Sequence, residues 1–167
     1  MKLPKLLAFS LGFLAIASCA IAQADPYINI LSGNSGLVNQ GGEVFIEVTV
    51  GNAGPIDDIP AGKIITQISI PPAIVSIAVT GHVLPPGWTI VSSSATFIQI
   101  CNNSDIIPVF EERTILINVS GNTIGGPSTI IGQLSAVTNC STPSSISGDD
   151  NANNSSTTTI QVCNGCV

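Results

Sequence analysis

The sequence predicts an all-β fold: an immunoglobulin-like antiparallel two-sheet sandwich of about seven to nine strands, preceded by a cleaved signal peptide. Three observations predict it. Short segments rich in Val, Ile and Thr follow one another along the chain, and Gly, Pro, Asn and Ser separate them at intervals of about 10 residues. No segment has a helical periodicity long enough to predict a helix. The chain also begins with an apolar segment that follows two lysines.

Residues 1–24 have the layout of an export signal. Two lysines form the basic start, residues 6–17 are apolar, and residues 22–24 (Ala-Gln-Ala) are an A-x-A cleavage site. We therefore expect a secreted or cell-surface chain that begins at Asp25. No transmembrane anchor is expected, because every later apolar stretch is interrupted within roughly 10 residues, whereas a spanning helix needs about 20.

A second processing route starts from residues 16–19 (Ile-Ala-Ser-Cys), which fit the pattern at which bacterial lipoproteins are cut and lipidated. Cys19 would then carry the lipid and hold the protein at a membrane. Residues 20–22 continue the apolar segment and lead to the A-x-A site, which favours the soluble product.

Residues 25–162 are expected to form one domain, since a chain of this length buries about two-thirds of its unfolded surface in a single core. The clearest strand is 43–50, in which Phe45 and Glu47 lie on one face and four aliphatic side chains on the other. The four are Val44, Ile46, Val48 and Val50. In chain order, the expected strands are residues 27–31, 43–50, 63–70, 73–80, 89–92, 96–100, 114–119, 129–137 and 156–162.

Prolines and glycines separate these strands. Pro71-Pro72 and residues 85–87 (Pro-Pro-Gly) have too few N–H donors for a central ladder, so they end strands or lie at edges. Residues 51–55 are typical of a turn. Residues 163–167 are expected to form a Cys-containing tail after the domain.

The charges exclude two classes of partner. Beyond residue 24 only Lys63 and Arg113 are basic, against ten acidic residues. Nucleic acids and anionic membrane surfaces are bound through Lys and Arg, so neither is an expected partner.

Beyond the signal the chain has four cysteines, and an even number in an exported chain predicts disulfides. Three connectivities are open, and the sequence does not choose among them. One of them pairs Cys101 with Cys140, since each closes a strand, and leaves Cys163 and Cys166 for a small terminal loop. The Cys-x-x-Cys spacing of the latter pair also occurs in redox proteins, but here it follows a strand rather than opening a helix, which favours a structural disulfide.

Three segments carry a resemblance to a known family. Residues 48–55 (Val-Thr-Val-Gly-Asn-Ala-Gly-Pro) are similar to a strand ending in an Asn-x-Gly-Pro turn, and 84–92 (Leu-Pro-Pro-Gly-Trp-Thr-Ile-Val-Ser) to a Leu-Pro-x-Gly turn into a strand. Residues 150–155 (Asp-Asn-Ala-Asn-Asn-Ser) are similar to an Asp-Asn-x-x-Asn-Asn lead into a last strand. Together, over residues 42–162, they resemble the Ig-like "domain of unknown function eleven" conserved-repeat family of bacterial secreted and cell-surface proteins.

The resemblance implies a structural or adhesive module at the cell surface or in the extracellular matrix, with no catalytic residue to carry over. Two departures weaken a role as a spacer in a stalk. The segment between Pro55 and Leu84 is longer than the family's spacing, and the chain holds one copy where the family often occurs in tandem.

Catalytic candidates are few. His82 is the only histidine, and no acid near it in sequence would orient it as a base, so a turn histidine is favoured. Glu111 and Glu112 are adjacent on an extended segment, so their carboxylates point to opposite faces and do not converge as a glycosidase pair would. We therefore expect no enzyme activity and no cofactor.

Calcium is the metal that the sequence could accommodate best. Asp149, Asp150 and Asn151 offer oxygen ligands in one polar loop, and Asp57-Asp58 could add more, but no EF-hand spacing is present and hydrated turns are favoured. Trp88 lacks aromatic neighbours in sequence, which favours core packing over a sugar platform.

The leading hypothesis is thus a non-catalytic, exported module that contacts other surface or matrix proteins or glycans. The alternative is a small ligand-binding module, for a glycan or calcium, that uses the loops at one end of the sandwich. A secreted enzyme would need carboxylates gathered from distant loops.

Overall fold

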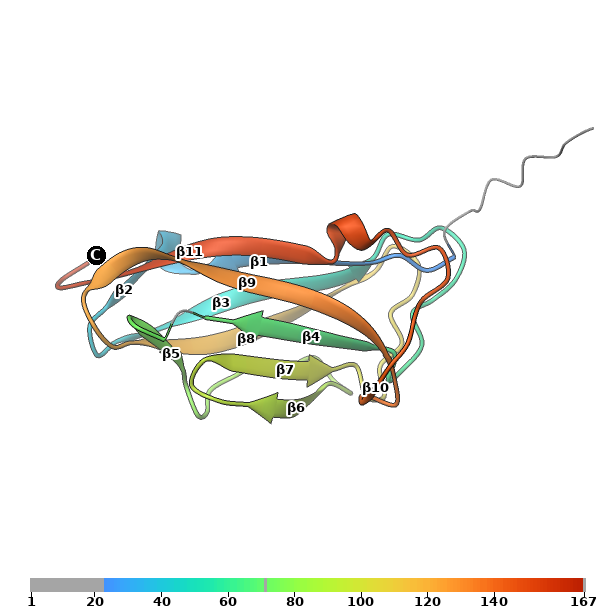
Figure 1. The fold of residues 1–167 in the computed structure, drawn as a ribbon, viewed down its shortest axis with the longest axis horizontal. Coiled ribbons are helices and arrows are strands. Elements are labelled where there is room, and N and C mark those ends of the chain that lie inside the picture. Colours follow the sequence, from blue (N-terminus) through green and yellow to red (C-terminus); the bar gives the residue numbers. More distant parts are fainter. Residues whose placement is uncertain (1–22, 71, 167) are drawn as a thin grey trace, which may run out of the picture.

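The computed structural model describes residues 23–70 and 72–166 and confirms the all-β class (Figure 1). Two sheets face each other and enclose one apolar core. The predicted export signal, including Cys19 as a lipidation site, falls almost entirely outside the described residues. No helix in the described part of the chain is long and apolar enough to cross a membrane.

The first sheet has four strands in the order β1-β3-β8-β5 and is antiparallel throughout. The second sheet runs β2-β11-β9-β4-β7-β6, with β10 added beside β9 and with β2 parallel to β11. The strands of the first sheet are β1 (Pro26–Ser32), β3 (Glu43–Asn52), β5 (Val75–Ile77) and β8 (Glu112–Gly121). Those of the second are β2 (Leu37–Asn39), β4 (Ile64–Ser69), β6 (Thr89–Ser93), β7 (Phe97–Cys101), β9 (Gly125–Thr138), β10 (Thr142–Pro143) and β11 (Ser155–Cys163).

All nine expected strands are present, and the structure adds two short ones, β2 and β10. The expected strand 73–80 is shortened to β5, because regular pairing with β8 ends at Ile77. Beyond it the Ala78 N–H donates to the Asn118 carbonyl at 3.0 Å, and Val83 pairs with Leu116. Two 3₁₀ turns, at Asn34–Gly36 and Asn151–Asn153, complete the described elements.

The predicted alternation in β3 is confirmed. Ile46, Val48 and Val50 are fully buried, whereas Phe45 and Glu47 are exposed. Isoleucine dominates the interior on both sheets, as expected where β-branched side chains pack on pleated surfaces.

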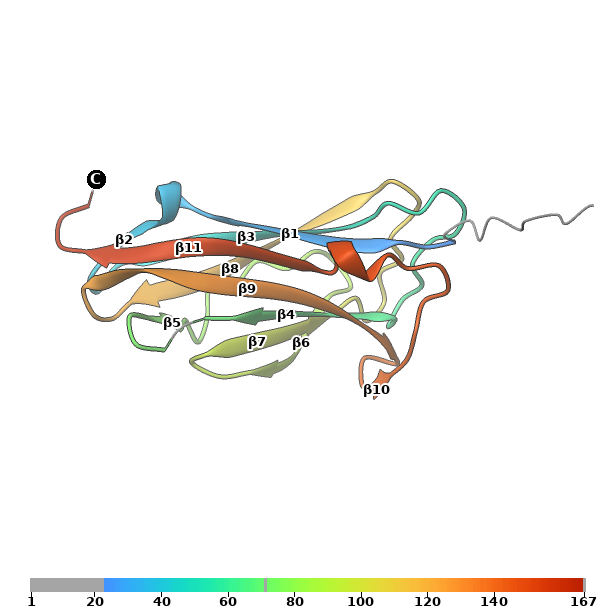
Figure 2. The same ribbon diagram turned by 45° about the horizontal axis from the view of Figure 1, so that its top comes forward.

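The two sheets lie close together along β1 and β11 (Figure 2). The Ile30 N–H donates to Ser156 Oγ at 3.2 Å, and the hydroxyls of Ser32 and Thr158 lie 3.2 Å apart. These contacts close one long side of the sandwich, so both strands shape the same surface.

The structure pairs Cys101 with Cys140 and Cys163 with Cys166. The first disulfide joins the end of β7 to the turn after β9 across 39 residues, which stabilises the fold by about 4 kcal/mol in the chain-entropy account. The second closes the terminal loop, which Asn39 holds: the Cys166 N–H donates to Asn39 Oδ1 at 2.8 Å.

The core placement predicted for Trp88 is confirmed, since the side chain is 5% exposed. Its Nε1–H donates to Asp105 Oδ2 at 2.7 Å, and the same carboxylate accepts from Arg113 Nε at 2.8 Å. The alternative of a sugar-binding platform at Trp88 is therefore wrong, because the ring is buried and its N–H already donates to Asp105.

Candidate functional site

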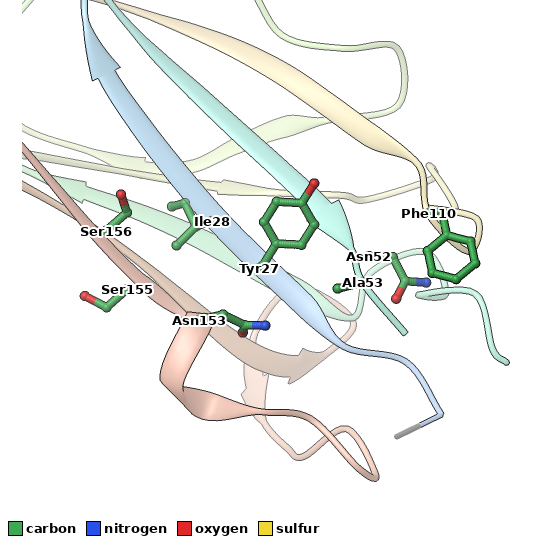
Figure 3. A pocket seen from close by; sticks show the side chains of 8 residues that line it. All are labelled: Tyr27, Ile28, Asn52, Ala53, Phe110, Asn153, Ser155 and Ser156. Carbon is green, nitrogen blue, oxygen red and sulfur yellow. The ribbon is translucent and has the colours of Figure 1, made fainter. Parts of the chain in front are cut away.

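An open groove of about 570 Å³ lies at the end of the sandwich where β1 begins (Figure 3). In Figure 3 the rings of Tyr27 and Phe110 lie to one side of β1 together with Asn52, and Asn153, Ser155 and Ser156 lie to the other. Among the described residues, no charged side chain lines it. The lining residues are Tyr27, Ile28, Asn52, Ala53, Phe110, Asn153, Ser155 and Ser156.

Tyr27 forms a fixed part of the groove. It pairs with Gly51 on β3, and a Cβ at position 51 would lie 2.5 Å from the Tyr27 ring, so only glycine leaves room for the ring to lie across the strand. The hydroxyl donates to the Glu112 carboxylate on β8. Burial is the larger cause, and the hydrogen bond to the Glu112 carboxylate and its negative charge are the smaller ones, that raise the pKa of Tyr27 to about 12. The phenol therefore stays neutral at physiological pH.

Phe110 is the opposite case, an aromatic side chain that is 73% exposed. Its backbone lies in the left-handed region at φ 62°, where a bulky residue is a genuine outlier that costs roughly 1–3 kcal/mol. Its N–H donates to the Asn52 carbonyl at 2.9 Å, which holds the residue at the edge of the groove. The surrounding loop thus holds Phe110 with a strained backbone and an exposed ring.

Asn52 organises the loops around the groove. The side chain is 1% exposed, its Oδ1 accepts from the N–H groups of Asp25 and Gly54 at 3.1 and 3.0 Å, and its Nδ2 donates to the carbonyls of Asp57 and Ile107 at 2.9 and 3.3 Å. Every hydrogen-bonding position of the amide is therefore used. Asn52 joins three separate segments and has no capacity left for a ligand.

Asn102 connects the neighbouring loops in the same way, through four hydrogen bonds of its side-chain amide. Its Oδ1 accepts from Lys63 and Ile64, and its Nδ2 donates to the carbonyls of Pro60 and Asp105, at 2.9 to 3.1 Å. The Asn102 amide is fully buried. Both asparagines therefore supply hydrogen-bond partners to backbone N–H and carbonyl groups at the end of the sandwich, where the strands no longer pair.

The polar wall of the groove is attached to Asp25. Its Oδ1 accepts from the Asp150 N–H at 3.0 Å, and both of its carboxylate oxygens lie 3.2 Å from Asn153 Nδ2. The Oδ1 atoms of Asn153 and Asn154 are buried without a hydrogen-bond partner. Asp25 therefore fixes the 3₁₀ turn that carries Asn153 into the groove.

The calcium candidates are gathered in one loop, but their oxygens already accept hydrogen bonds. Asp149 accepts from Asn154 Nδ2 at 2.9 Å, and Asp150 accepts from the Ala152 N–H at 3.1 Å. Burial is the main cause that raises the pKa of Asp149. Within residues 23–70 and 72–166, no group of three His, Cys, Asp or Glu side chains is arranged to hold a metal ion. Calcium binding stays the less favoured alternative that the sequence offered.

The catalytic candidates have structural partners. His82 Nδ1 accepts the Asn118 N–H at 3.1 Å, and burial lowers the pKa of the imidazole. Glu111 forms an ion pair with Arg113 at 3.0 Å, and Glu112 accepts from Tyr27.

Sequence reasoning placed Tyr27 in the first strand but missed the groove, Phe110 and the roles of Asn52 and Asn102. The only local signal for Phe110 is an aromatic residue between Pro108 and two glutamates, in a segment that was not expected to be a strand.

No family model matches the sequence, and no curated protein is similar to it in sequence. The resemblance to the conserved-repeat family stays a prediction.

Solved structures share the fold. The CARDB domain of the PF1109 protein from Pyrococcus furiosus, solved in complex with di-metal ions, is 14% identical, with 91% of this chain and 99% of that chain covered and a TM-score of 0.53. A cohesin module from a Clostridium perfringens family 33 glycoside hydrolase is 8% identical, with 86% and 98% covered and a TM-score of 0.55. A non-cellulosomal cohesin from Archaeoglobus fulgidus is 11% identical, with 84% and 92% covered and a TM-score of 0.50. At these identities the likeness shows the fold alone.

Proposed function

We propose that this chain is an exported, non-catalytic immunoglobulin-like module with a structural or adhesive role at the cell surface or in the extracellular matrix. The groove beside Tyr27 and Phe110 is where it contacts its partner, another surface or matrix protein or a glycan. Export rests on the signal predicted in residues 1–24. The sandwich fold, which CARDB and cohesin domains share, supports a binding module.

The observation that carries the proposal is Phe110. An exposed aromatic ring gains little from folding, and its left-handed backbone makes folding less favourable. Exposed aromatic residues are typical anchors of interfaces, because a partner that covers the ring removes a large apolar area from water. The groove beside the ring gives such a partner a concave surface to fill.

The composition of the groove favours an uncharged partner surface. Ser155 offers an exposed hydroxyl group opposite the rings, whereas the Asn153 amide is bonded to Asp25 and Ser156 Oγ accepts the Ile30 N–H. Among the described residues no lysine or arginine lines the groove. Phosphate groups are recognised chiefly by Arg and Lys, so phosphate-rich ligands are disfavoured.

A small glycan is the second candidate, favoured by the same pair of Tyr27 and Phe110. Sugar rings have apolar faces that stack on aromatic side chains, and the exposed Ser155 hydroxyl on the facing wall can bond to a sugar hydroxyl. Calcium is a weaker alternative, because the oxygens of Asp149 and Asp150 already accept hydrogen bonds within their loop.

The test is binding of the purified protein to a panel of glycans and matrix proteins, followed by surface plasmon resonance on each hit. Phe110→Ala is expected to weaken binding about tenfold or more, the usual effect of losing a buried aromatic anchor. Ile124→Ala is the matched control, since Ile124 is 53% exposed in the turn between β8 and β9, away from the groove. Equal binding by both variants would refute the groove as the contact site.

A glycan and a protein partner are separated by the same panel. Binding to immobilised saccharides that free saccharide competes away supports the glycan, whereas binding to deglycosylated matrix protein supports a protein partner. A rise in melting temperature with calcium, abolished by a chelator, would instead favour the calcium alternative.

A further inference from the structure

Residues 23–25 are built into the sandwich. Ala24 is 4% exposed and belongs to the apolar core. The Gln23 carbonyl accepts the N–H of Asp57 at 2.9 Å and that of Ile56 at 3.4 Å. A chain that began at Asp25 would lack both the buried methyl group and this carbonyl.

The loop after β3 is shaped around the same residues. A Cβ at position 54 would lie 2.6 Å from Gln23 O, 2.7 Å from the Asp25 nitrogen and 2.8 Å from the Ala24 Cα, so only glycine allows this approach. The Ala53 N–H donates to the Asp25 carbonyl at 2.8 Å, and the Asp25 N–H donates to Asn52 Oδ1 at 3.1 Å. The loop therefore contacts all three of residues 23–25.

Cleavage after Ala24 conflicts with this arrangement in two ways. It deletes the acceptor of the Asp57 N–H, and it turns the Asp25 amide into a charged ammonium against the buried Asn52 side chain. A charged group in such a place loses hydration that the neighbouring amide does not fully replace. Gln23, by contrast, is exposed, so a charge on its nitrogen would remain in water.

We infer that the export signal is cut after Ala22, so that the mature chain begins at Gln23. Ala20-Ile21-Ala22 supplies a second A-x-A site, two residues before the one formed by residues 22–24. Water hydrolyses the Ala22–Gln23 peptide bond, which leaves a carboxylate on Ala22 and an α-ammonium group on Gln23. The inference rests on the proposed export of the chain.

The first test is the intact mass and N-terminal sequence of the native protein recovered outside the cells that produce it. A chain beginning at Gln23, with or without loss of ammonia through closure of its side chain on the new amine, supports the inference. A chain beginning at Asp25 or at an acylated Cys19 overturns it while leaving export intact. A chain beginning at Met1 also overturns it, and a protein found only inside the cells refutes export itself.

Two signal variants make the test specific. Ala20→Leu places a large side chain at the first alanine of Ala20-Ile21-Ala22 and leaves the site at 22–24 unchanged, so it is expected to block formation of the Gln23 chain. Ile21→Leu changes the unrestricted middle position and should be processed normally. If Ala20→Leu yields the same N-terminus as the wild-type chain, the inference is wrong.

Stability provides a separate readout. Two chains are produced with removable tags that leave no extra residue, one beginning at Gln23 and one at Asp25. The Asp25 chain is expected to unfold at a clearly lower urea concentration and lower temperature, with its disulfides intact in both cases. Equal unfolding midpoints would show that Gln23 and Ala24 contribute nothing and would remove the physical basis of the inference.

Discussion

Backbone strain at Phe110 can be measured by comparing Phe110→Gly with Phe110→Ala. Both variants lose the ring, so its packing cancels from the difference. At φ 62° a residue with a Cβ costs about 1–2 kcal/mol that glycine avoids. Glycine in turn costs about 0.5–1 kcal/mol of additional chain entropy. The glycine variant is therefore expected to be more stable than the alanine variant by about 0.5–1 kcal/mol.

Urea unfolding of the purified protein under non-reducing conditions gives this difference directly. Ile124 supplies the control pair, because it is also exposed but does not have a positive φ. There the ordinary order is expected, with Ile124→Ala more stable than Ile124→Gly by about 0.5–1 kcal/mol. If alanine is the more stable residue at position 110 as well, the loop relaxes and no strain is stored.

Function should separate from stability in the same variants. Both substitutions at position 110 remove the ring and are expected to lose binding to the partner equally. A glycine variant that is more stable than the alanine variant but equally inactive would mean that the strain serves the contact surface and not the fold.

Three further predictions concern stability and use the same unfolding assay. Asn52→Ala leaves two N–H groups and two carbonyls without their side-chain partner and is expected to cost about 3–5 kcal/mol, whereas a loss below about 1 kcal/mol would mean that water replaces the amide. Thr66 is fully buried and its hydroxyl has no partner, so Thr66→Val is expected to stabilise by about 1 kcal/mol, and a destabilised variant would reveal an overlooked bond. His82 must stay neutral to accept the Asn118 N–H, and its pKa is lowered, chiefly by burial, from the ordinary value of 6.5. The unfolded chain therefore takes up this proton more readily, so stability is full above pH 6.5 and is lost as the pH falls below it. His82→Gln should remove that slope, and an unchanged slope would assign it to other groups.

The strands could be predicted because their signal is local. Alternation in β3 and the turn residues around it determine which side chains face the core, and no distant information is needed. β2 and β10 could not be predicted in this way. They contain three and two residues, and they pair only because β11 and β9 bring partners to them.

The site could not be predicted from the sequence because its contacts are long-range. Asn52 bonds to Asp25 and Ile107, 27 and 55 residues away, and no pattern around position 52 distinguishes such an amide from one in an ordinary turn. The left-handed backbone of Phe110 could not be predicted either, because glycine or asparagine usually occupies such a position and position 110 has neither.

The two ends of the described chain lie at opposite ends of the long axis (Figure 1). Asp25 bonds to Asn52 and Asn153, so the N-terminal end of the described chain lies beside the groove. An attachment point therefore determines how the module is presented. A lipid on Cys19 would anchor the groove end within a few residues of the bilayer and turn Phe110 toward the cell's own envelope. A soluble chain, or one held from its other end, would direct the same ring outward to neighbouring cells or matrix.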